Sequence, residues 1–155
     1  PLFSVAENMT MPIAARLGRF GLIKSGRRDA IARRLIAQLD IKTSGPGQQV
    51  SALSGGNQQK IILAREIERD PDLLIVGQPT RGVDIGAIEF IHRRLIELRD
   101  QGKAILLVSV ELDEIRSLSD RIIVMFAGKV MGERGPDADE RELGLLMAGV
   151  TKDAA

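Results

Sequence analysis

A glycine-rich string, LSGGNQQK at Leu53 to Lys60, is the first group of residues that could do chemistry. A serine and two adjacent glycines stand just before IILAREI, whose apolar residues recur at helical spacing. Serine is a favoured N-cap, and glycine lets the backbone approach a ligand closely because it has no Cβ. The N–H groups of a helix N-terminus bind phosphate. The string therefore indicates either a phosphate-binding helix start, with Ser54 as the cap, or an ordinary N-capped helix after a loop.

A second candidate group, LLIVGQPTRGVD, occupies Leu73 to Asp84. A phosphoryl-transfer enzyme needs a Gly-rich loop with a Lys that cradles phosphates, an Asp at a strand end for Mg²⁺, and a group that orients the attacking water. No G-x-x-x-x-G-K-[ST] string occurs in the sequence. Gly77 has no carboxylate, and Gln78 cannot take a proton near neutral pH, although its amide could orient a water. These two residues equally suit the end of a strand before a Pro–Thr turn.

The amino-acid composition excludes several classes of protein. A chain of 155 residues fits one domain or one large piece of one, and 44% hydrophobic residues are ample for a buried core. The 22 Lys and Arg balance the 21 Asp and Glu, so no bulk field would attract nucleic acid or anionic lipid. Cysteine is absent and His92 is the single histidine, which argues against thiol chemistry and metal clusters. No apolar stretch approaches the length of a membrane span.

Hydrophobic periodicity predicts helices alternating with strands. Helices are expected over Arg28 to Leu39, from the glycine-rich string to about Asp70, over Gly86 to Gln101, over Glu111 to Leu118, and over Glu140 to Met147 with Leu143, Leu146 and Met147 facing inward. Buried parallel strands are expected over Leu73 to Val76 and Ala104 to Val108, and two further strands over Arg121 to Phe126 and Lys129 to Gly132, around the turn Ala127-Gly128.

This alternation predicts an α/β fold with a mainly parallel sheet, flanking helices and right-handed crossovers. The part before the glycine-rich string is expected to be all helical and to form a small separate lobe. We therefore expect three parts. A helical-lobe segment and loop covers residues 1–52, an α/β core that starts with the glycine-rich helix covers 53–133, and a C-terminal helix and tail cover 134–155.

Five strings, SVAENM, LSGGNQQK, QPTRGVD, GAIEFIHRRL and LSDRIIVM, make nearly the whole chain similar to the ATP-binding cassette (ABC) ATPases, a P-loop NTPase family. The sequence resembles the C-terminal part of the second cassette of a double-cassette ATPase from importers of nucleosides or simple sugars. The resemblance implies a partial P-loop NTPase fold. In it LSGGNQQK is the signature, Leu73 to Asp84 is the Walker B strand followed by the D-loop, and VSVELDE at Val108 to Glu114 is the switch segment.

The same resemblance implies that the ATP site of this cassette is degenerate. Most family members have an Asp–Glu pair where this chain has Gly77 and Gln78, and a switch histidine where it has Val110. An apolar valine cannot donate a hydrogen bond to phosphate. We therefore expect no catalytic residue and no metal ligand at these positions.

The signature, by contrast, is intact. In the family, two cassettes pair head to tail, and the signature of one completes the ATP site of the other. The resemblance implies that the Ser54 hydroxyl and the backbone N–H groups of the two glycines meet the γ-phosphate held by the partner cassette, and that the D-loop lies across the interface. The residues implied for ATP binding in trans are Ser54, Gly55, Gly56, Asn57 and Gln58, with Asp84 in the D-loop.

The resemblance also implies cofactors and partners. The chain begins at Pro1 without Met, and we expect it to be a fragment whose phosphate cradle lies upstream. ATP and Mg²⁺ are expected in the full-length assembly, with none bound tightly by the fragment, which is predicted to be inactive alone. The expected partners are the first cassette of the same protein, transmembrane permease subunits and, indirectly, an extracytoplasmic solute-binding protein, but not nucleic acid. The expected location is the cytoplasmic face of a prokaryotic cell membrane, with the fragment itself soluble.

Two alternatives remain open. A non-transport ABC ATPase of translation or DNA repair would favour an intact Asp–Glu pair and a basic surface, whereas this chain has Gly77, Gln78 and balanced charge. A catalytically dead dimerisation or regulatory module would not need two glycines and an Asn–Gln pair at a helix start.

Overall fold

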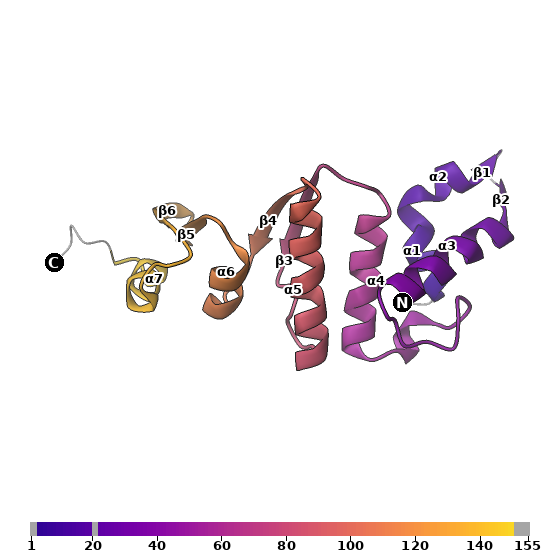
Figure 1. The fold of residues 1–155 in the computed structure, drawn as a ribbon, viewed down its shortest axis with the longest axis horizontal. Coiled ribbons are helices and arrows are strands. Elements are labelled where there is room, and N and C mark those ends of the chain that lie inside the picture. Colours follow the sequence, from indigo (N-terminus) through magenta and orange to yellow (C-terminus); the bar gives the residue numbers. More distant parts are fainter. Residues whose placement is uncertain (1–2, 20–21, 151–155) are drawn as a thin grey trace. The chain divides into compact units, whose positions relative to one another are not determined.

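The computed structural model describes residues 3–19 and 22–150 of the chain, which folds as two units. Unit 1 comprises Pro1–Leu74 and Pro79–Ala104, and unit 2 comprises Ile75–Gln78 and Ile105–Ala155. Figure 1 shows the helices and strands of both units along the chain.

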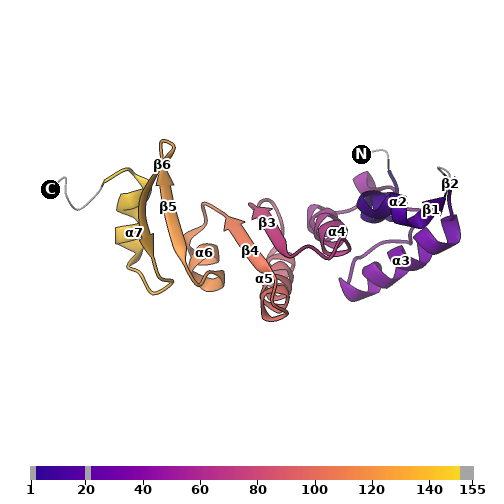
Figure 2. The same ribbon diagram turned by 90° about the horizontal axis from the view of Figure 1, so that it is seen from above.

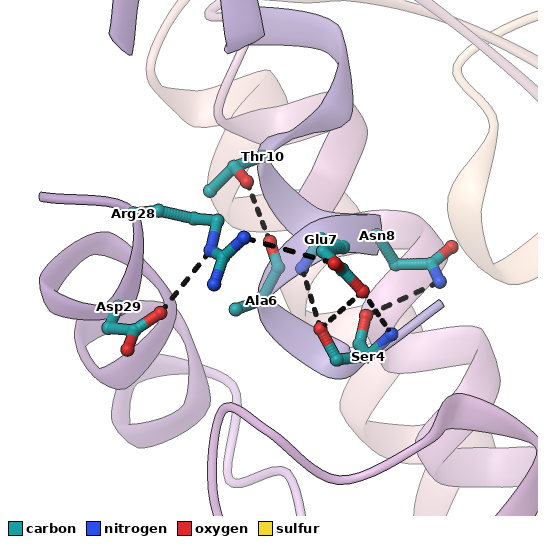
Figure 3. Close-up of polar contacts among 7 residues, drawn as sticks. All are labelled: Ser4, Ala6, Glu7, Asn8, Thr10, Arg28 and Asp29. Atoms are coloured by element: carbon teal, nitrogen blue, oxygen red, sulfur yellow. Dashed lines mark hydrogen bonds and ion pairs between the residues drawn. The ribbon is translucent and has the colours of Figure 1, made fainter. Parts of the chain in front are cut away.

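Unit 1 begins with helix α1, Val5–Thr10, whose start is fixed by a capping box. The Glu7 backbone N–H donates to the Ser4 hydroxyl at 3.3 Å, and the Ser4 backbone N–H donates to the Glu7 carboxylate at 2.8 Å. Figure 3 shows this reciprocal pair, with the Arg28 guanidinium 3.9 Å from the same carboxylate. The S-x-x-E spacing that produces this start is visible in the sequence.

The segment up to the glycine-rich string is mostly but not wholly helical. After α1 come the 3-10 helix η1, Met11–Ile13, and helix α2, Ala14–Leu17. Strands β1, Gly18–Arg19, and β2, Leu22–Ile23, then pair antiparallel before helix α3, Ser25–Gln38. The all-helical prediction is therefore wrong for this hairpin. Two-residue strands are too short to leave an alternating pattern in a sequence.

The core of unit 1 lies where α1 and α3 pack against helix α4, Gly55–Ile67. A second 3-10 helix, η2, Val50–Ala52, precedes α4, and helix α5, Ile85–Asp100, lies beside α4 in both views (Figures 1 and 2). One buried cluster takes residues from α1, α3, η2, α4 and the loops next to them, with the partly buried Phe90 of α5 against it, while α5 buries Ala87, Ile91, Leu95 and Leu98 along its own inner face. The buried members of this cluster are Val5, Ala6, Met9, Ala32, Leu35, Leu39, Ile41, Val50, Leu53, Ile61 and Ala64.

Strands β3, Leu73–Gly77, and β4, Ala104–Val108, form a two-stranded sheet. The Ala104 N–H donates to the Asp72 carbonyl at 2.9 Å and the Gln78 N–H to the Val108 carbonyl at 2.8 Å. The residue numbers rise together along the two strands, from Asp72 and Ala104 to Gln78 and Val108. The strands are therefore parallel, as the sequence predicts.

The predicted burial of these two strands is wrong for one face. Leu74 is buried, but Leu73, Ile75, Leu106 and Val108 are each more than half exposed. Parallel strands have both faces covered when helices pack on each side. Among residues 3–19 and 22–150, no layer covers the face that carries these four side chains.

The rest of unit 2 is helix α6, Leu112–Leu118, strands β5, Ile122–Phe126, and β6, Lys129–Arg134, and helix α7, Glu140–Met147. β5 and β6 pair antiparallel, and α7 lies along β5 (Figure 2). Leu143 and Leu146 of α7 are buried against Ile122 and Val124, which confirms two of the three predicted inward residues. Met147, the last residue of the helix, is instead 37% exposed, so the prediction is wrong for it.

Most of the predicted elements are confirmed to within a few residues, and the α/β class with parallel strands is confirmed as a whole. The Ala127-Gly128 turn between β5 and β6 is also confirmed, since both residues have left-handed backbones, with φ of 46° and 77°. The three-part division at 52/53 and 133/134 stays a prediction, and its C-terminal tail at 151–155 lies outside the described residues.

Candidate functional site

The glycine-rich string forms the start of α4, with Ser54 at the N-cap position and Gly55 and Gly56 in the first turn. Ser54 has an extended backbone, and its carbonyl accepts from the Gln58 N–H at 2.9 Å. Ser54 thus occupies the predicted cap position, but its hydroxyl accepts no backbone hydrogen bond from the helix. The predicted side-chain cap is wrong in this respect, because the hydroxyl bonds to another side chain.

That side chain is Asn57, whose Nδ2 donates to Ser54 Oγ at 2.9 Å. The other end of the Asn57 amide, Oδ1, accepts from the Lys42 backbone N–H at 2.8 Å. The next residue, Gln58, donates from Nε2 to the Leu53 carbonyl at 2.9 Å. The amides of Asn57 and Gln58 therefore bond to the protein itself, and both hold the segment that precedes α4.

The first turn of α4 packs against the loop Pro79 to Asp84. A Cβ added at Gly55 would lie 3.3 Å from the Gly82 carbonyl oxygen, and one at Gly56 would lie 3.1 Å from Asp84 Oδ2. Further along the helix, Gln59 Nε2 donates to the Pro79 carbonyl at 3.1 Å. The structure thus brings together the glycine-rich string and the loop Pro79 to Asp84, whose contacting residues are 20 to 28 positions apart in the sequence.

Asp84 caps the helix that follows it. It is the N-cap of α5, and its Oδ1 accepts from the Ala87 N–H at 2.9 Å. Asp84 therefore has a structural role as an N-cap, for which aspartate is one of the favoured residue types. Asp84 remains exposed on the surface of unit 1.

The three altered positions lie in unit 2, at the carboxyl ends of the parallel strands. Gly77 ends β3, Gln78 follows it, and Val110 is 63% exposed shortly after β4. Gln78 has a left-handed backbone, with φ of 49°. Such a backbone is uncommon for a non-glycine residue and is found most often in turns and functional sites. The side chains at these positions are an amide and a valine, neither of which is a metal-binding carboxylate.

The buried cation Lys60, at the end of the string, was not among the predicted site residues. Its Nζ donates to the Asp40 carbonyl at 2.9 Å and lies 4.2 Å from the centre of the Phe90 ring. The ammonium thereby joins the end of α3, α4 and α5 within unit 1. A lysine inside an amphipathic run usually lies on the solvent face, so the sequence carries no signal for its burial.

An ion pair lies on unit 1 between the end of α4 and the start of β4. Lys103 Nζ lies 2.7 Å from Asp70 Oδ1. The hydrogen bond and the charge of Lys103 lower the pKa of the Asp70 carboxyl, and the hydrogen bond with Asp70 raises the pKa of Lys103. Asp70 is exposed and Lys103 is half-buried, so this pair lies at the surface, orders it, and is not a candidate site.

Among the described residues, no three His, Cys, Asp or Glu side chains gather where they could hold a metal ion. Within that same part of the chain, no helix is both long enough and apolar enough to cross a membrane.

Comparison with characterised proteins gives several similar relatives. The chain is 49% identical to the guanosine import ATP-binding protein NupO of Bacillus subtilis, over 99% of this chain and 31% of that protein. It is 48% identical to the nucleoside import ATP-binding protein NupA of Lactococcus lactis, over 94% of this chain and 29% of that protein. A ribose import ATP-binding protein, RbsA 2 of Rubrobacter xylanophilus, is 42% identical over 96% of this chain and 28% of its own length. The chain thus spans about a third of the relatives that it matches.

The fold matches solved structures as well. A dimeric, post-hydrolysis structure of the ATP-binding cassette MJ0796 bound to ADP and Pi superposes with a TM-score of 0.74 at 25% identity. The match covers 90% of this chain and 59% of that one. The cassette MJ1267 of an ABC transporter gives the same TM-score at 20% identity, over 94% of this chain and 61% of that one. No protein-family model matches the sequence.

Proposed function

We propose that this chain, which belongs to the ATP-binding cassette (ABC) family of ATPases, is part of the energy-coupling subunit of an importer. The proposed solutes of this importer are nucleosides or simple sugars. We further propose that its signature completes an ATP site whose cradle belongs to a partner cassette, while its own site is degenerate. The support for the first proposal is the sequence identity to import ATP-binding proteins for guanosine, nucleosides and ribose.

The observation that carries the second proposal is the contrast between two groups of residues. At the start of α4, the Ser54 hydroxyl and the N–H groups of Gly55 and Gly56 lie at a helix N-terminus. Such N–H dipoles stabilise phosphate charge, and fixed donors of this kind contribute most to phosphoryl transfer. At the ends of β3 and β4, Gln78 and Val110 offer neither a metal-binding carboxylate nor an imidazole.

ATP and Mg²⁺ fit this chain unequally. The hydroxyl and N–H donors of the signature suit the oxygens of a terminal phosphate. Mg²⁺ is bound through carboxylates and phosphates, and the residues at Gly77 and Gln78 supply no carboxylate. We therefore assign both the metal and the phosphate cradle to other parts of the assembled protein. A dimeric, nucleotide-bound cassette among the structural relatives supports a site shared between two cassettes.

The proposed partners follow from the proposed role in an importer. A first cassette of the same protein would supply the cradle, permease subunits would transmit the motion, and an extracytoplasmic binding protein would deliver the solute. The proposed location is the cytoplasmic face of the membrane. Within the signature, we propose that Asn57 and Gln58 assist Ser54, Gly55 and Gly56, and that Asp84 of the D-loop adjoins the cassette–cassette interface.

The test compares two substitutions in the full-length protein that contains this segment. Ser54→Arg places a bulky side chain where the phosphate would lie, and we expect it to reduce ATP hydrolysis and solute uptake at least a hundredfold, the loss typical of a key charge-stabilising donor. Gln78→Ala should change both by less than threefold. Ser51→Arg, at an exposed position in η2, is the matched control and should behave as wild type. A larger loss from Gln78→Ala than from Ser54→Arg would place the chemistry on this half and overturn the proposal.

The isolated chain offers a second test. Because the proposed cradle lies elsewhere, purified 155-residue protein should hydrolyse ATP no faster than a buffer control, and titration calorimetry should find no micromolar ATP binding. Micromolar affinity would contradict the proposal that the phosphates are held by another part of the assembly.

A further inference from the structure

The orientation of the Asn57 amide is set by one of its two partners. The backbone N–H of Lys42 can only donate, so the atom it meets at 2.8 Å must be the acceptor Oδ1. The NH₂ end then faces Ser54 Oγ at 2.9 Å and must donate to it. Asparagine orientation is often ambiguous, but here the Lys42 N–H removes the ambiguity.

This orientation determines what the Ser54 hydroxyl can do. A serine hydroxyl has one proton to donate and lone pairs that accept. Because Ser54 Oγ accepts from Asn57, its own proton is not used in that contact. Among the described residues, no hydrogen bond uses this proton, and the free backbone groups of the helix start beside Oγ are N–H donors, which cannot accept it. The hydroxyl is therefore held as a donor toward whatever acceptor approaches the first turn of α4.

We propose that Asn57 is a positioning residue, which acts by presenting the Ser54 hydroxyl as a hydrogen-bond donor to a phosphate oxygen of the nucleotide. This inference rests on the proposed function of the signature. It differs from a direct role for Asn57, because both ends of its amide are already bonded within the protein.

The same contact gives the site a link to the segment before α4. Lys42 lies in the stretch between α3 and η2, whose neighbour Ile41 is buried in the core of unit 1. The Lys42 N–H holds Asn57, and Asn57 holds Ser54. A shift of this stretch would rotate the amide and release the hydroxyl, so the packing of α1 and α3 bears on the signature through a chain of two hydrogen bonds.

The test is a double-mutant cycle in the full-length protein, measured as kcat at saturating ATP. If Asn57 acts through Ser54, Asn57→Ala should lower kcat about tenfold, the effect of losing one hydrogen bond of ordinary strength. In a Ser54→Ala background the same change should lower kcat less than twofold, because no hydroxyl is left to position. Equal effects in the two backgrounds would overturn the inference.

Asn57→Asp is a second variant that separates positioning from folding. It keeps the acceptor for Lys42 and the shape of the side chain, but replaces the donor NH₂ by an oxygen that takes the Ser54 proton. We expect kcat to fall further than in Asn57→Ala, with thermal unfolding unchanged. The added negative charge acts with or without the hydroxyl, so Asn57→Asp in the Ser54→Ala background measures that contribution alone. A variant as active as wild type would refute the positioning role.

The outcomes also separate this inference from the proposed function. If Ser54→Ala alone leaves ATP hydrolysis unchanged, the signature does not serve the nucleotide and both fail. If Ser54→Ala lowers kcat but the Asn57 effects are additive with it, the proposed function stands and only the positioning role is overturned.

Discussion

Asp84 packs directly on Gly56, so that a Cβ at Gly56 would lie 3.1 Å from Asp84 Oδ2. It would also lie 3.0 Å from the Cβ of Ala87, whose N–H bonds to the other oxygen of the same carboxylate. The signature glycine is therefore required by the protein itself, in addition to any ligand that approaches the helix. Because the start of α4 contacts the start of α5, a substitution in one segment should alter the stability of the other.

Gly56→Ala should destabilise the chain. Replacing glycine by alanine inside a helix ordinarily gains about 0.5–1 kcal/mol, whereas overpacking a filled site costs about 1–3 kcal/mol. The contacts at Gly56 make the second effect the larger, so we expect a net loss of about 1 kcal/mol in urea unfolding. Hydrogen exchange at the Ala87 N–H should also accelerate, because Asp84 must move.

Gly26 provides the matched control for this experiment. It occupies the same second helical position in α3 that Gly56 has in α4, and a Cβ there would meet nothing within 4 Å. Gly26→Ala should therefore stabilise the chain slightly. Ala87→Gly should restore part of the stability lost in Gly56→Ala, since it removes the nearest carbon. A stabilising Gly56→Ala would show that the two segments are not in contact.

Gly149→Ala should destabilise unit 2 by about 3 kcal/mol. Gly149 ends α7 with φ of 81°, where its N–H and that of Val150 bond to the Leu146 and Leu145 carbonyls in a Schellman motif. An alanine there costs about 1–2 kcal/mol for the left-handed backbone alone. Its Cβ would also lie 2.6 Å from two atoms of the Phe126 ring, which must move. The urea midpoint of unit 2, followed by amide exchange in β5, measures the total.

A substitution at Gly102 separates the cost of the left-handed backbone from the cost of the contact with Phe126. It ends α5 in the same motif with φ of 86°, but a Cβ there would meet nothing within 4 Å. Gly102→Ala should thus show the backbone cost alone, about 1–2 kcal/mol. If the two variants lose the same stability, Phe126 does not pack on Gly149.

The sequence predicted best what depends on neighbours along the chain. The boundaries of β4 and α7 agree with the periodic pattern, because an apolar run or an amphipathic stripe is a local property. The capping box of Ser4 and Glu7 could have been predicted as well, from its three-residue spacing.

What the sequence could not predict depends on distance in space. The bond from Lys42 to Asn57 and the contact of Gly56 with Asp84 join segments whose approach is decided by helix packing. The exposure of one face of β3 and β4 was not predicted, for a related reason. A fully apolar strand predicts two covered faces, and whether a layer is there to cover Ile75 is a property of the whole fold.

The capping box makes part of the stability of unit 1 depend on pH. The hydrogen bonds from the Ser4 N–H and hydroxyl, with a smaller contribution from the charge of Arg28, lower the pKa of the Glu7 carboxyl below its usual value. Unfolded chains then bind a proton more readily than folded ones, so this contribution is present above the unfolded pKa and is lost as pH falls through the folded one. Glu7→Gln removes the titrating group, and its urea midpoint should fall less than that of wild type between about pH 6 and about pH 3. Glu89→Gln, at an exposed carboxylate on α5, should instead follow wild type. Equal acid sensitivity of Glu7→Gln and wild type would mean that the carboxylate does not hold the start of α1 in solution.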